Sequence, residues 1–197
     1  SEPSCADDVI SVAAYASEWV TPTGVTTGGA MASFSSRGPR YDGVMKPDIA
    51  APGVSIGAAI SSYTDASFSS VESIEFDGRT YHFAKLSGTS MASPMVAGIA
   101  ALLLEAKPEL SATEVKQILL STAREDNKTG ILPTEGHPKW GHGKVDAMAA
   151  LREALNLGLG HSEEDFSFKV YPNPVDNTLY IDELKNILYS IKKNGKN

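Results

Sequence analysis

The chain has 197 residues, of which 42% are hydrophobic, and its formal net charge is −7 at pH 7. That length and apolar content are sufficient for a globular fold with a buried core, and the absence of a Lys/Arg run argues against a nucleic-acid partner. No apolar run of membrane-spanning length and no His/Cys pattern at zinc spacing is apparent, so neither a membrane span nor a zinc site is expected. Cys5 has no second cysteine to pair with, and we expect it to be a small apolar filler.

The first part of the chain is predicted to hold one buried strand and several turns. Residues 9–14 (Val-Ile-Ser-Val-Ala-Ala) are apolar on both faces, which is typical of a central parallel strand. Residues 21–32 are rich in Gly and Thr and predict a loop. Residues 34–49 alternate turn signals with short strand material, and Pro52-Gly53 predicts another loop.

A hairpin is predicted in the middle of the chain. Residues 74–83 alternate in polarity, and Asp77-Gly78 between them is a strong signal for a tight turn that joins two strands. The polar residues 61–70 are expected to form a surface loop that leads into this hairpin. Its second strand would then deliver the chain to residue 87.

Ser90 lies among small residues, where a glycine-containing loop is predicted to become a helix. Gly88 would let the loop turn sharply, and residues 91–105, rich in Ala and Leu, predict a buried helix. Pro94 is expected in its first turn, where a backbone N–H has no intrahelical acceptor to lose. Ser90 would thus lie at a helix N-terminus, which favours a developing negative charge. This position suits a nucleophile whose attack creates an oxyanion, and the alternative is a serine that only caps a buried helix.

Two further helices are predicted after this one. Pro108 ends the preceding helix, and Ser111 with Glu114 forms a capping box at the start of the next. Residues 146–155 predict a last helix with its apolar residues on one face. Strands and helices together predict an α/β fold with a mainly parallel sheet and helices on both faces.

Several blocks of this sequence resemble the subtilisin-like serine proteases, or subtilases. Residues 88–98 match the family's nucleophile motif, Gly-Thr-Ser-Met-Ala-x-Pro-x-Val-Ala-Gly, at every fixed position. Residues 32–39 (Ala-Ser-Phe-Ser-Ser-Arg-Gly-Pro) and 46–53 (Lys-Pro-Asp-Ile-Ala-Ala-Pro-Gly) resemble segments that precede this motif in the family. Residues 141–147 (Gly-His-Gly-Lys-Val-Asp-Ala) look like the segment before the family's last helix. The resemblance defines an expected domain over residues 1–157.

The resemblance implies the subtilisin-like three-layer fold, of which this chain would hold the C-terminal portion. It also implies a serine endopeptidase that acts on protein or peptide substrates by a Ser–His–Asp mechanism. Ser90 would be the catalytic nucleophile and its own N–H one oxyanion donor, while Gly88, Thr89 and Met91 would border the substrate, although packing alone would also account for Thr89 and Met91. Asp48 matches a position near a weak cation site in some members, but we expect a structural carboxylate there and assign no metal. No cofactor is expected, and calcium, which the complete family fold allows, is not assignable to residues of this chain.

The family's other catalytic motifs are not found in this sequence. Its histidine lies in a His-Gly-Thr-x-Val motif, its aspartate in an Asp-Ser/Thr-Gly motif and its oxyanion asparagine in an Ala-Gly-Asn-type motif. We expect all three to lie upstream of this chain, in a missing N-terminal part of the catalytic domain, so that the chain alone is inactive. No replacement base is predicted among His82, His137, His142, His161 and Lys85. The alternative function is a non-catalytic surface or interaction module that retains a subtilase scaffold.

The end of the chain differs in character from the rest. Residues 158–167 are polar and acidic and predict a linker. Within residues 168–197, Tyr171-Pro-Asn-Pro174 and the strand-like residues after it resemble the start of the C-terminal sorting domain of type IX secretion. That resemblance implies a short β-type tail, contact with the type IX secretion machinery, and a secreted or cell-surface location in a Gram-negative bacterium. An incidental Pro-rich tail is the alternative.

Overall fold

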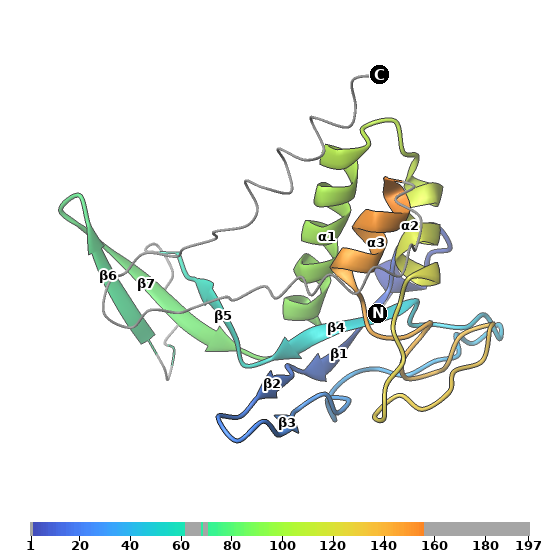
Figure 1. Ribbon diagram of the computed structural model, residues 1–197, viewed down its shortest axis with the longest axis horizontal. Coiled ribbons are helices and arrows are strands. Elements are labelled where there is room, and N and C mark those ends of the chain that lie inside the picture. Colours follow the sequence, from blue (N-terminus) through green and yellow to red (C-terminus); the bar gives the residue numbers. More distant parts are fainter. Residues whose placement is uncertain (1, 62–67, 69–70, 156–197) are drawn as a thin grey trace. The chain divides into compact units, whose positions relative to one another are not determined.

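In the computed structural model, residues 2–61, 68 and 71–155 are described. The chain divides into two units, Ser1–Gly158 and Leu159–Asn197. The predicted linker 158–167 and tail 168–197 lie outside the described residues, as does most of the predicted loop 61–70. The elements in chain order are a 3-10 helix (Glu2–Cys5), β1 (Val12–Ala16), β2 (Trp19–Val20), β3 (Thr26–Thr27), β4 (Ile49–Val54), β5 (Ile56–Ala59), β6 (Val71–Phe76), β7 (Arg79–Leu86), α1 (Thr89–Ala106), α2 (Ala112–Ser121) and α3 (Ala147–Ala154) (Figure 1).

The parallel strands β1 and β4 carry the core of the described residues. Their register pairs Val12 with Ile49 and shifts after Tyr15, which pairs with Pro52. The loop predicted at Pro52-Gly53 is therefore wrong, because both residues belong to β4. Proline has no N–H for the ladder, and strands tolerate it where pairing is irregular. The register shift beside Pro52 is such a place.

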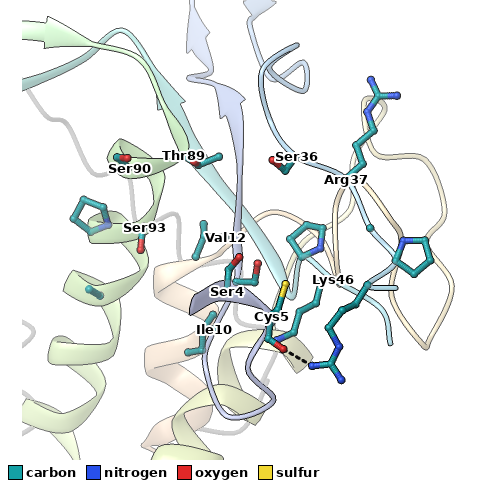
Figure 2. Close-up of a pocket in the computed structure, with 17 residues that line it drawn as sticks. Ser4, Cys5, Ile10, Val12, Ser36, Arg37, Lys46, Thr89, Ser90 and Ser93 are labelled. Carbon is teal, nitrogen blue, oxygen red and sulfur yellow. Dashed lines mark hydrogen bonds between the residues drawn. The ribbon is translucent and has the colours of Figure 1, made fainter. Parts of the chain in front are cut away.

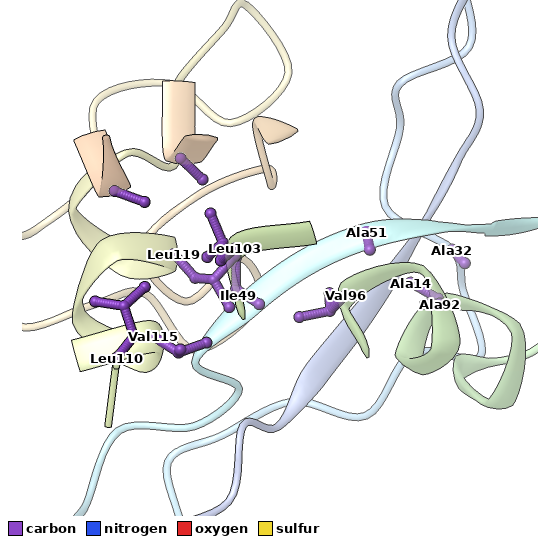
Figure 3. Packing of buried hydrophobic residues seen from close by; sticks show 12 residues of the cluster. Ala14, Ala32, Ile49, Ala51, Ala92, Val96, Leu103, Leu110, Val115 and Leu119 are labelled. Carbon is purple, nitrogen blue, oxygen red and sulfur yellow. The ribbon is translucent and has the colours of Figure 1, made fainter. Parts of the chain in front are cut away.

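Both faces of this strand pair are buried, as the apolar sequence of β1 predicts. On one face Ala14 and Ala51 lie in the same packed cluster as Ala92 of α1 (Figure 3). Because these side chains are all small, the helix lies close on the strands. On the other face Tyr15 packs against Trp140, with ring centroids 6.2 Å apart.

The predicted central hairpin is confirmed as β6 and β7, which pair antiparallel along the whole of β6. Both turn residues have positive φ, 49° at Asp77 and 70° at Gly78, as a type I′ turn requires. β5 pairs with the other edge of β7, so the three strands form an antiparallel sheet in the order β5-β7-β6. This sheet carries the chain from the end of β4 to the start of α1 (Figure 1).

A second, very short hairpin lies partly within the loop predicted over residues 21–32. Its strands β2 and β3 pair antiparallel through two residue pairs, Trp19 with Thr27 and Val20 with Thr26. Strands of two residues are too short to show an alternating pattern in the sequence. The prediction of a loop is therefore correct for most of this segment and misses the pairing.

α1 begins two residues before the predicted start, at Thr89, with Gly88 as its N-cap residue. Pro94 consequently lies inside the helix, and the expectation that it occupies the first turn is wrong. A proline inside a helix has no N–H to offer the carbonyl four residues earlier, which is that of Ser90. The first turn of α1 therefore lacks one of the hydrogen bonds that usually hold a helix start.

The two later helices begin where their caps predict. Ser111 Oγ accepts the N–H of Glu114, and the Glu114 carboxylate accepts the N–H of Ser111, which completes the capping box of α2. Asp146 caps α3 by accepting the N–H of Ala149 at 2.9 Å. Both helices add side chains to the cluster beneath α1 (Figure 3).

α1 is apolar around most of its circumference, and the described residues leave much of it exposed. Its 18 residues have a mean hydropathy of 1.4, and 17% of them are buried. Met95, Leu102 and Leu104 are 42%, 50% and 41% exposed. By length and composition alone this helix is long and apolar enough to cross a membrane, so the expectation that no apolar run reaches that length is wrong. One side of α1 nevertheless packs on β1 and β4, and core helices of layered α/β folds have the same apolar composition.

Candidate active site

Ser90 is the second residue of α1. Its N–H therefore belongs to the first turn, whose N–H groups have no acceptor within the helix. Among the residues that the structure describes, none forms a hydrogen bond with the N–H or the Oγ of Ser90, and the residue is exposed. The helix dipole adds a partial positive charge at this end. The Ser90 N–H is thus free to donate to an anionic oxygen formed beside its own Oγ.

Gly88 supports this position by its hydrogen bond and not by a sharp turn. Its φ of 165° and ψ of 160° are extended values, so the turn predicted there is wrong. Its N–H donates to the carbonyl oxygen of Gly53 at 2.8 Å. One residue earlier, Ser87 Oγ accepts the N–H of Ser55, also at 2.8 Å. These two bonds tie the loop before Ser90 to the end of β4.

Gly53 has no space for a side chain. A Cβ at this position would lie 2.7 Å from the Cβ of Ala14 and 2.8 Å from the carbonyl oxygen of Gly88. We therefore expect Gly53→Ala to displace the loop before Ser90 and to lower the free energy of unfolding by about 1–3 kcal/mol, the usual cost of overpacking. Urea unfolding measures this loss. Gly57→Ala is the matched control because a Cβ at Gly57 has nothing within 4 Å, and equal midpoints for the two variants would contradict this packing.

Ser90 opens onto a pocket of about 720 Å³ (Figure 2). The first turns of α1 form one wall, to which Ser90, Ser93 and Ala97 belong. Ile10 and Val12, before and at the start of β1, lie across from them, and the loop over residues 36–40 closes the far side. The volume of the pocket lies within the range of about 300–1,000 Å³ that is usual for ligand-binding pockets.

Only two of the four residues that the sequence predicts for the site line this pocket. Ser90 and Thr89 line the pocket, whereas Gly88 and Met91 are not among its lining residues. The N–H of Met91 donates to the carbonyl oxygen of Gly88 at 3.0 Å, so Met91 belongs to the helix start. Sequence reasoning missed Ser36, which lines the pocket from a distant loop. No local pattern marks such a residue, because only the fold brings it near Ser90.

No general base is brought to Ser90 by the described residues. The pocket lining includes no histidine, aspartate or glutamate. His82 lies on β7, where its Nδ1 is 2.8 Å from Ser73 Oγ. His137 accepts the N–H of Lys139 through Nδ1 at 3.1 Å, and His142 is in the same loop. Lys85 is an exposed residue of β7, and His161 lies outside the described residues.

Cys5 is exposed and lines the pocket, so the expectation that it is a small apolar filler is wrong. Its carbonyl oxygen accepts a hydrogen bond, drawn as a dashed line in Figure 2, from the Arg40 guanidinium. The same guanidinium pairs with Asp42 and Asp7, each at 2.6 Å. The bonds to Asp42 first, and then to Asp7, raise the pKa of Arg40 further above its already high ordinary value. Arg40 thereby connects the N-terminal residues to the loop on the far side of the pocket.

Asp48 contacts Lys46, a residue of the pocket lining, and its carboxylate has three partners. Its carboxylate pairs with the Lys46 ammonium at 2.7 Å and with that of Lys116 at 3.3 Å, and it accepts the N–H of Ser11 at 2.6 Å. These contacts join the residues just before β1 and just before β4 to α2. In the part of the chain that the structure describes, no group of three or more His, Cys, Asp or Glu side chains is placed to hold a metal ion.

A buried charged cluster that the sequence did not reveal lies on the Trp140 side of β1. Lys144 is 0% exposed, and its ammonium pairs with Glu18 at 2.8 Å and with Asp126 at 2.6 Å. The same ammonium lies 4.7 Å from the centre of the Tyr15 ring and 5.4 Å from that of Trp140. Burial alone would raise the pKa of Asp126, but the hydrogen bonds that it accepts, first of all from Lys144, hold it well below its usual range.

Comparison with known proteins places these features in a family context. A family model described as the Subtilase family matches residues 1–143. Subtilisin-like protease SBT4.9 of Arabidopsis thaliana is 34% identical over 168 aligned residues, which cover 80% of this chain and 23% of that protein. SBT4.4 of the same plant is 40% identical over 131 residues, covering 66% of this chain and 16% of that protein. The chain spans about a quarter or less of the length of these curated relatives.

A solved structure shows the same fold. The crystal structure of fervidolysin from Fervidobacterium pennivorans, a keratinolytic enzyme related to subtilisin, superimposes with a TM-score of 0.52 at 27% identity. The superposition covers 76% of this chain and 20% of that chain. The CspB protease of Clostridium perfringens gives the same score and identity over 78% of this chain and 28% of its own.

Proposed function

This chain belongs to the subtilase family, and we propose on that premise that the protein it comes from is a serine endopeptidase with Ser90 as its nucleophile. The observation that carries the proposal is the position of Ser90. Its exposed Oγ and its free N–H lie together at the N-terminus of α1, on the wall of a pocket of about 720 Å³. Gly88, Thr89 and Met91 would hold the nucleophile and the substrate backbone close to each other.

In the proposed reaction, a general base takes the proton of Ser90 Oγ while Oγ bonds to the carbonyl carbon of a substrate peptide. The carbonyl oxygen becomes an anion, and the Ser90 N–H donates a hydrogen bond to it. The amine then leaves with the proton that the base returns. Water, deprotonated by the same base, hydrolyses the ester that remains on Ser90 and restores the hydroxyl.

We propose further that the base, its orienting carboxylate and the second oxyanion donor come from outside this chain. The support is chemical, because a serine without a base is a weak nucleophile at neutral pH. It is also geometric, because no histidine or carboxylate belongs to the pocket lining. The Asp48 carboxylate, which lies nearby, is already engaged by two ammonium groups and a backbone N–H.

The chain alone is therefore expected to hydrolyse no peptide bonds. The measurement is turnover of fluorescence-quenched peptides by residues 1–197, with its Ser90→Ala variant as the background, beside the complete protein. We expect the chain to match the background and the complete protein to exceed it. Turnover by the chain that depends on Ser90 would overturn the external base. If the complete protein is also inactive, a non-catalytic module with a subtilase scaffold becomes the better account.

For location, we propose a secreted or cell-surface protease in a Gram-negative bacterium, exported with the type IX machinery. The support is the resemblance of residues 168–197, around Tyr171-Pro-Asn-Pro174, to the start of a sorting domain. Deletion of residues 168–197 tests this in the native host, since continued export of the shortened protein would contradict it.

A further inference from the structure

The antiparallel sheet β5-β7-β6 is attached to the loop that carries Ser90. β5 begins two residues after β4 ends, and its first residue, Ile56, pairs with Leu86, the last residue of β7. Two hydrogen bonds tie the loop after β7 to the end of β4. β7 therefore leads from the sheet directly into the nucleophile loop (Figure 1).

One face of this sheet is apolar and open. Ile74 pairs directly with Tyr81, and directly paired residues of an antiparallel sheet share a face. Because strand residues alternate between faces, Phe76 and Phe83 belong to this face as well. Ile74, Tyr81 and Phe76 are 41%, 44% and 71% exposed. With the two small, exposed residues that β5 adds, this surface, which we call the apolar face, consists of Gly57, Ala59, Ile74, Phe76, Tyr81 and Phe83.

The opposite face of the sheet is polar, and its side chains bond with one another. Ser73 Oγ lies 2.8 Å from His82 Nδ1, and Thr80 Oγ1 donates to the Glu75 carboxylate. A sheet with one polar and one apolar face ordinarily packs the apolar face on a core. Here β5, β6 and β7 add no residue to either packed hydrophobic cluster of the described chain. The described residues thus leave most of the apolar face exposed.

Three charged residues argue against a permanent cover for this face. Glu72, Arg79 and Lys85 pair with members of the apolar face and therefore lie on it. Their side chains have no ion pair or hydrogen bond within the part of the chain that the structure describes. A permanent cover would have to bury these charges, which is costly unless each is paired. Aromatic residues and arginine are also the side chains enriched at surfaces that bind other proteins.

We propose that the apolar face is an exosite, a binding surface outside the pocket, for an extended apolar stretch of a polypeptide substrate. The proposal rests on the proposed function and names the substrate class of the same site, which is polypeptides with apolar side chains several residues away from the hydrolysed bond. The occupant follows from the continuity of the apolar face with the nucleophile loop. A substrate chain held at Ser90 needs only to continue along β7 to reach it.

The length of β7 sets how far this substrate chain must extend. From Leu86 to Arg79 the strand advances roughly 23 Å, at about 3.3 Å per residue. An extended substrate segment of about seven residues spans the same distance. Alternate side chains of an extended segment point to one side. Apolar residues at every second position would therefore contact Phe83, Tyr81 and Phe76 in turn.

The test compares quenched peptides hydrolysed by the complete protein. A short peptide is extended by about ten residues at its carboxyl or its amino end, with isoleucine or phenylalanine at every second position. The gain is kcat/KM for the extended peptide divided by kcat/KM for the short one. We expect a gain of at least about tenfold for one of the two ends, and none when threonine replaces the apolar residues of the extension.

Tyr81→Thr and Glu75→Thr are the matched variants, because the two residues are exposed on opposite faces of the sheet and threonine suits a strand at either position. Tyr81→Thr should reduce the gain below about threefold, and Glu75→Thr should keep it. Because the gain is a ratio measured on one enzyme, any loss of folded protein cancels.

A binding measurement separates the exosite from the proposed function. The complete protein with Ser90→Ala should bind the preferred extended peptide at least about tenfold more tightly than the short one in fluorescence anisotropy, and adding Tyr81→Thr should remove the difference. Exosite binding that passes these tests in a protein without Ser90-dependent turnover would contradict the proposed function alone.

Several results would overturn the exosite. They are no gain at either end, an equal gain for the threonine extension, a gain that survives Tyr81→Thr, and an equal loss in Glu75→Thr. Self-association of the complete protein that Tyr81→Thr abolishes would also overturn it, since the apolar face would then be covered by a second copy.

Discussion

Replacement of Ser90 by alanine is expected to lower kcat for peptide hydrolysis by the complete protein about a million-fold, a scale taken from subtilisin, a member of the same family. The reason is that, in the proposed reaction, Ser90 Oγ forms the covalent bond to the substrate, and alanine has no oxygen to form it. The variant keeps the backbone N–H, so the oxyanion donor and substrate binding survive. KM should therefore change far less than kcat, and steady-state kinetics on a quenched peptide separate the two.

Folding does not explain such a loss, because Ser90 is exposed and its side chain makes no hydrogen bond to any described residue. Ser121→Ala is the matched control: Ser121 is an exposed serine at the end of α2, whose Oγ donates only to the Ile118 carbonyl, at 3.3 Å. This control should retain full activity. A Ser90→Ala variant with a substantial fraction of wild-type kcat would remove Ser90 from the reaction.

The second large effect concerns stability, at Lys144. Lys144→Met would keep the apolar contacts with the Tyr15 and Trp140 rings while removing the ammonium between Glu18 and Asp126. Glu18 and Asp126 would each lose a charged hydrogen-bond donor, although the Arg124 guanidinium still pairs with both. We therefore expect the free energy of unfolding to fall by about 2 kcal/mol. Urea unfolding followed by tryptophan fluorescence measures this change.

Lys128→Met is the matched control for this substitution. Lys128 is exposed, and it contacts the same carboxylate only through its backbone N–H, which donates to Asp126 Oδ1 at 2.8 Å. We expect its free energy of unfolding to stay within about 0.5 kcal/mol of the wild-type value, as for most surface substitutions. Equal stability of the two variants would mean that the ion pairs of Lys144 contribute nothing net.

The features that the sequence predicts well depend on a few neighbouring residues. Asp77-Gly78 gives the hairpin because a type I′ turn needs two residues with positive φ. Ser111 and Glu114 give the start of α2 because their mutual hydrogen bonds span a single turn. The presence of a helix start close to Ser90 is predictable for the same reason, as a change from loop composition to a run of helix formers, although α1 begins two residues earlier than predicted.

The features that the sequence does not reveal depend on residues far apart in the chain. Lys144 resembles a surface lysine in the sequence, and only the fold brings Glu18 and Asp126 to its ammonium. Cys5 and Ser36, which are also far apart in the sequence, line the same pocket only because the fold brings them together. The prediction of a loop at Pro52 is wrong for a related reason. A proline is tolerated in β4 because the pairing register shifts beside it, and the sequence does not show that shift.

The most direct test of the account is covalent labelling with a fluorophosphonate probe, which reacts with an activated serine, followed by mass spectrometry of the labelled peptide. We predict that the complete protein is labelled on Ser90 and not on the neighbouring Ser93, that Ser90→Ala abolishes the label, and that residues 1–197 alone remain unlabelled. Labelling of the isolated chain at Ser90 would contradict the external base. Absence of label on the complete protein would contradict Ser90 as its nucleophile.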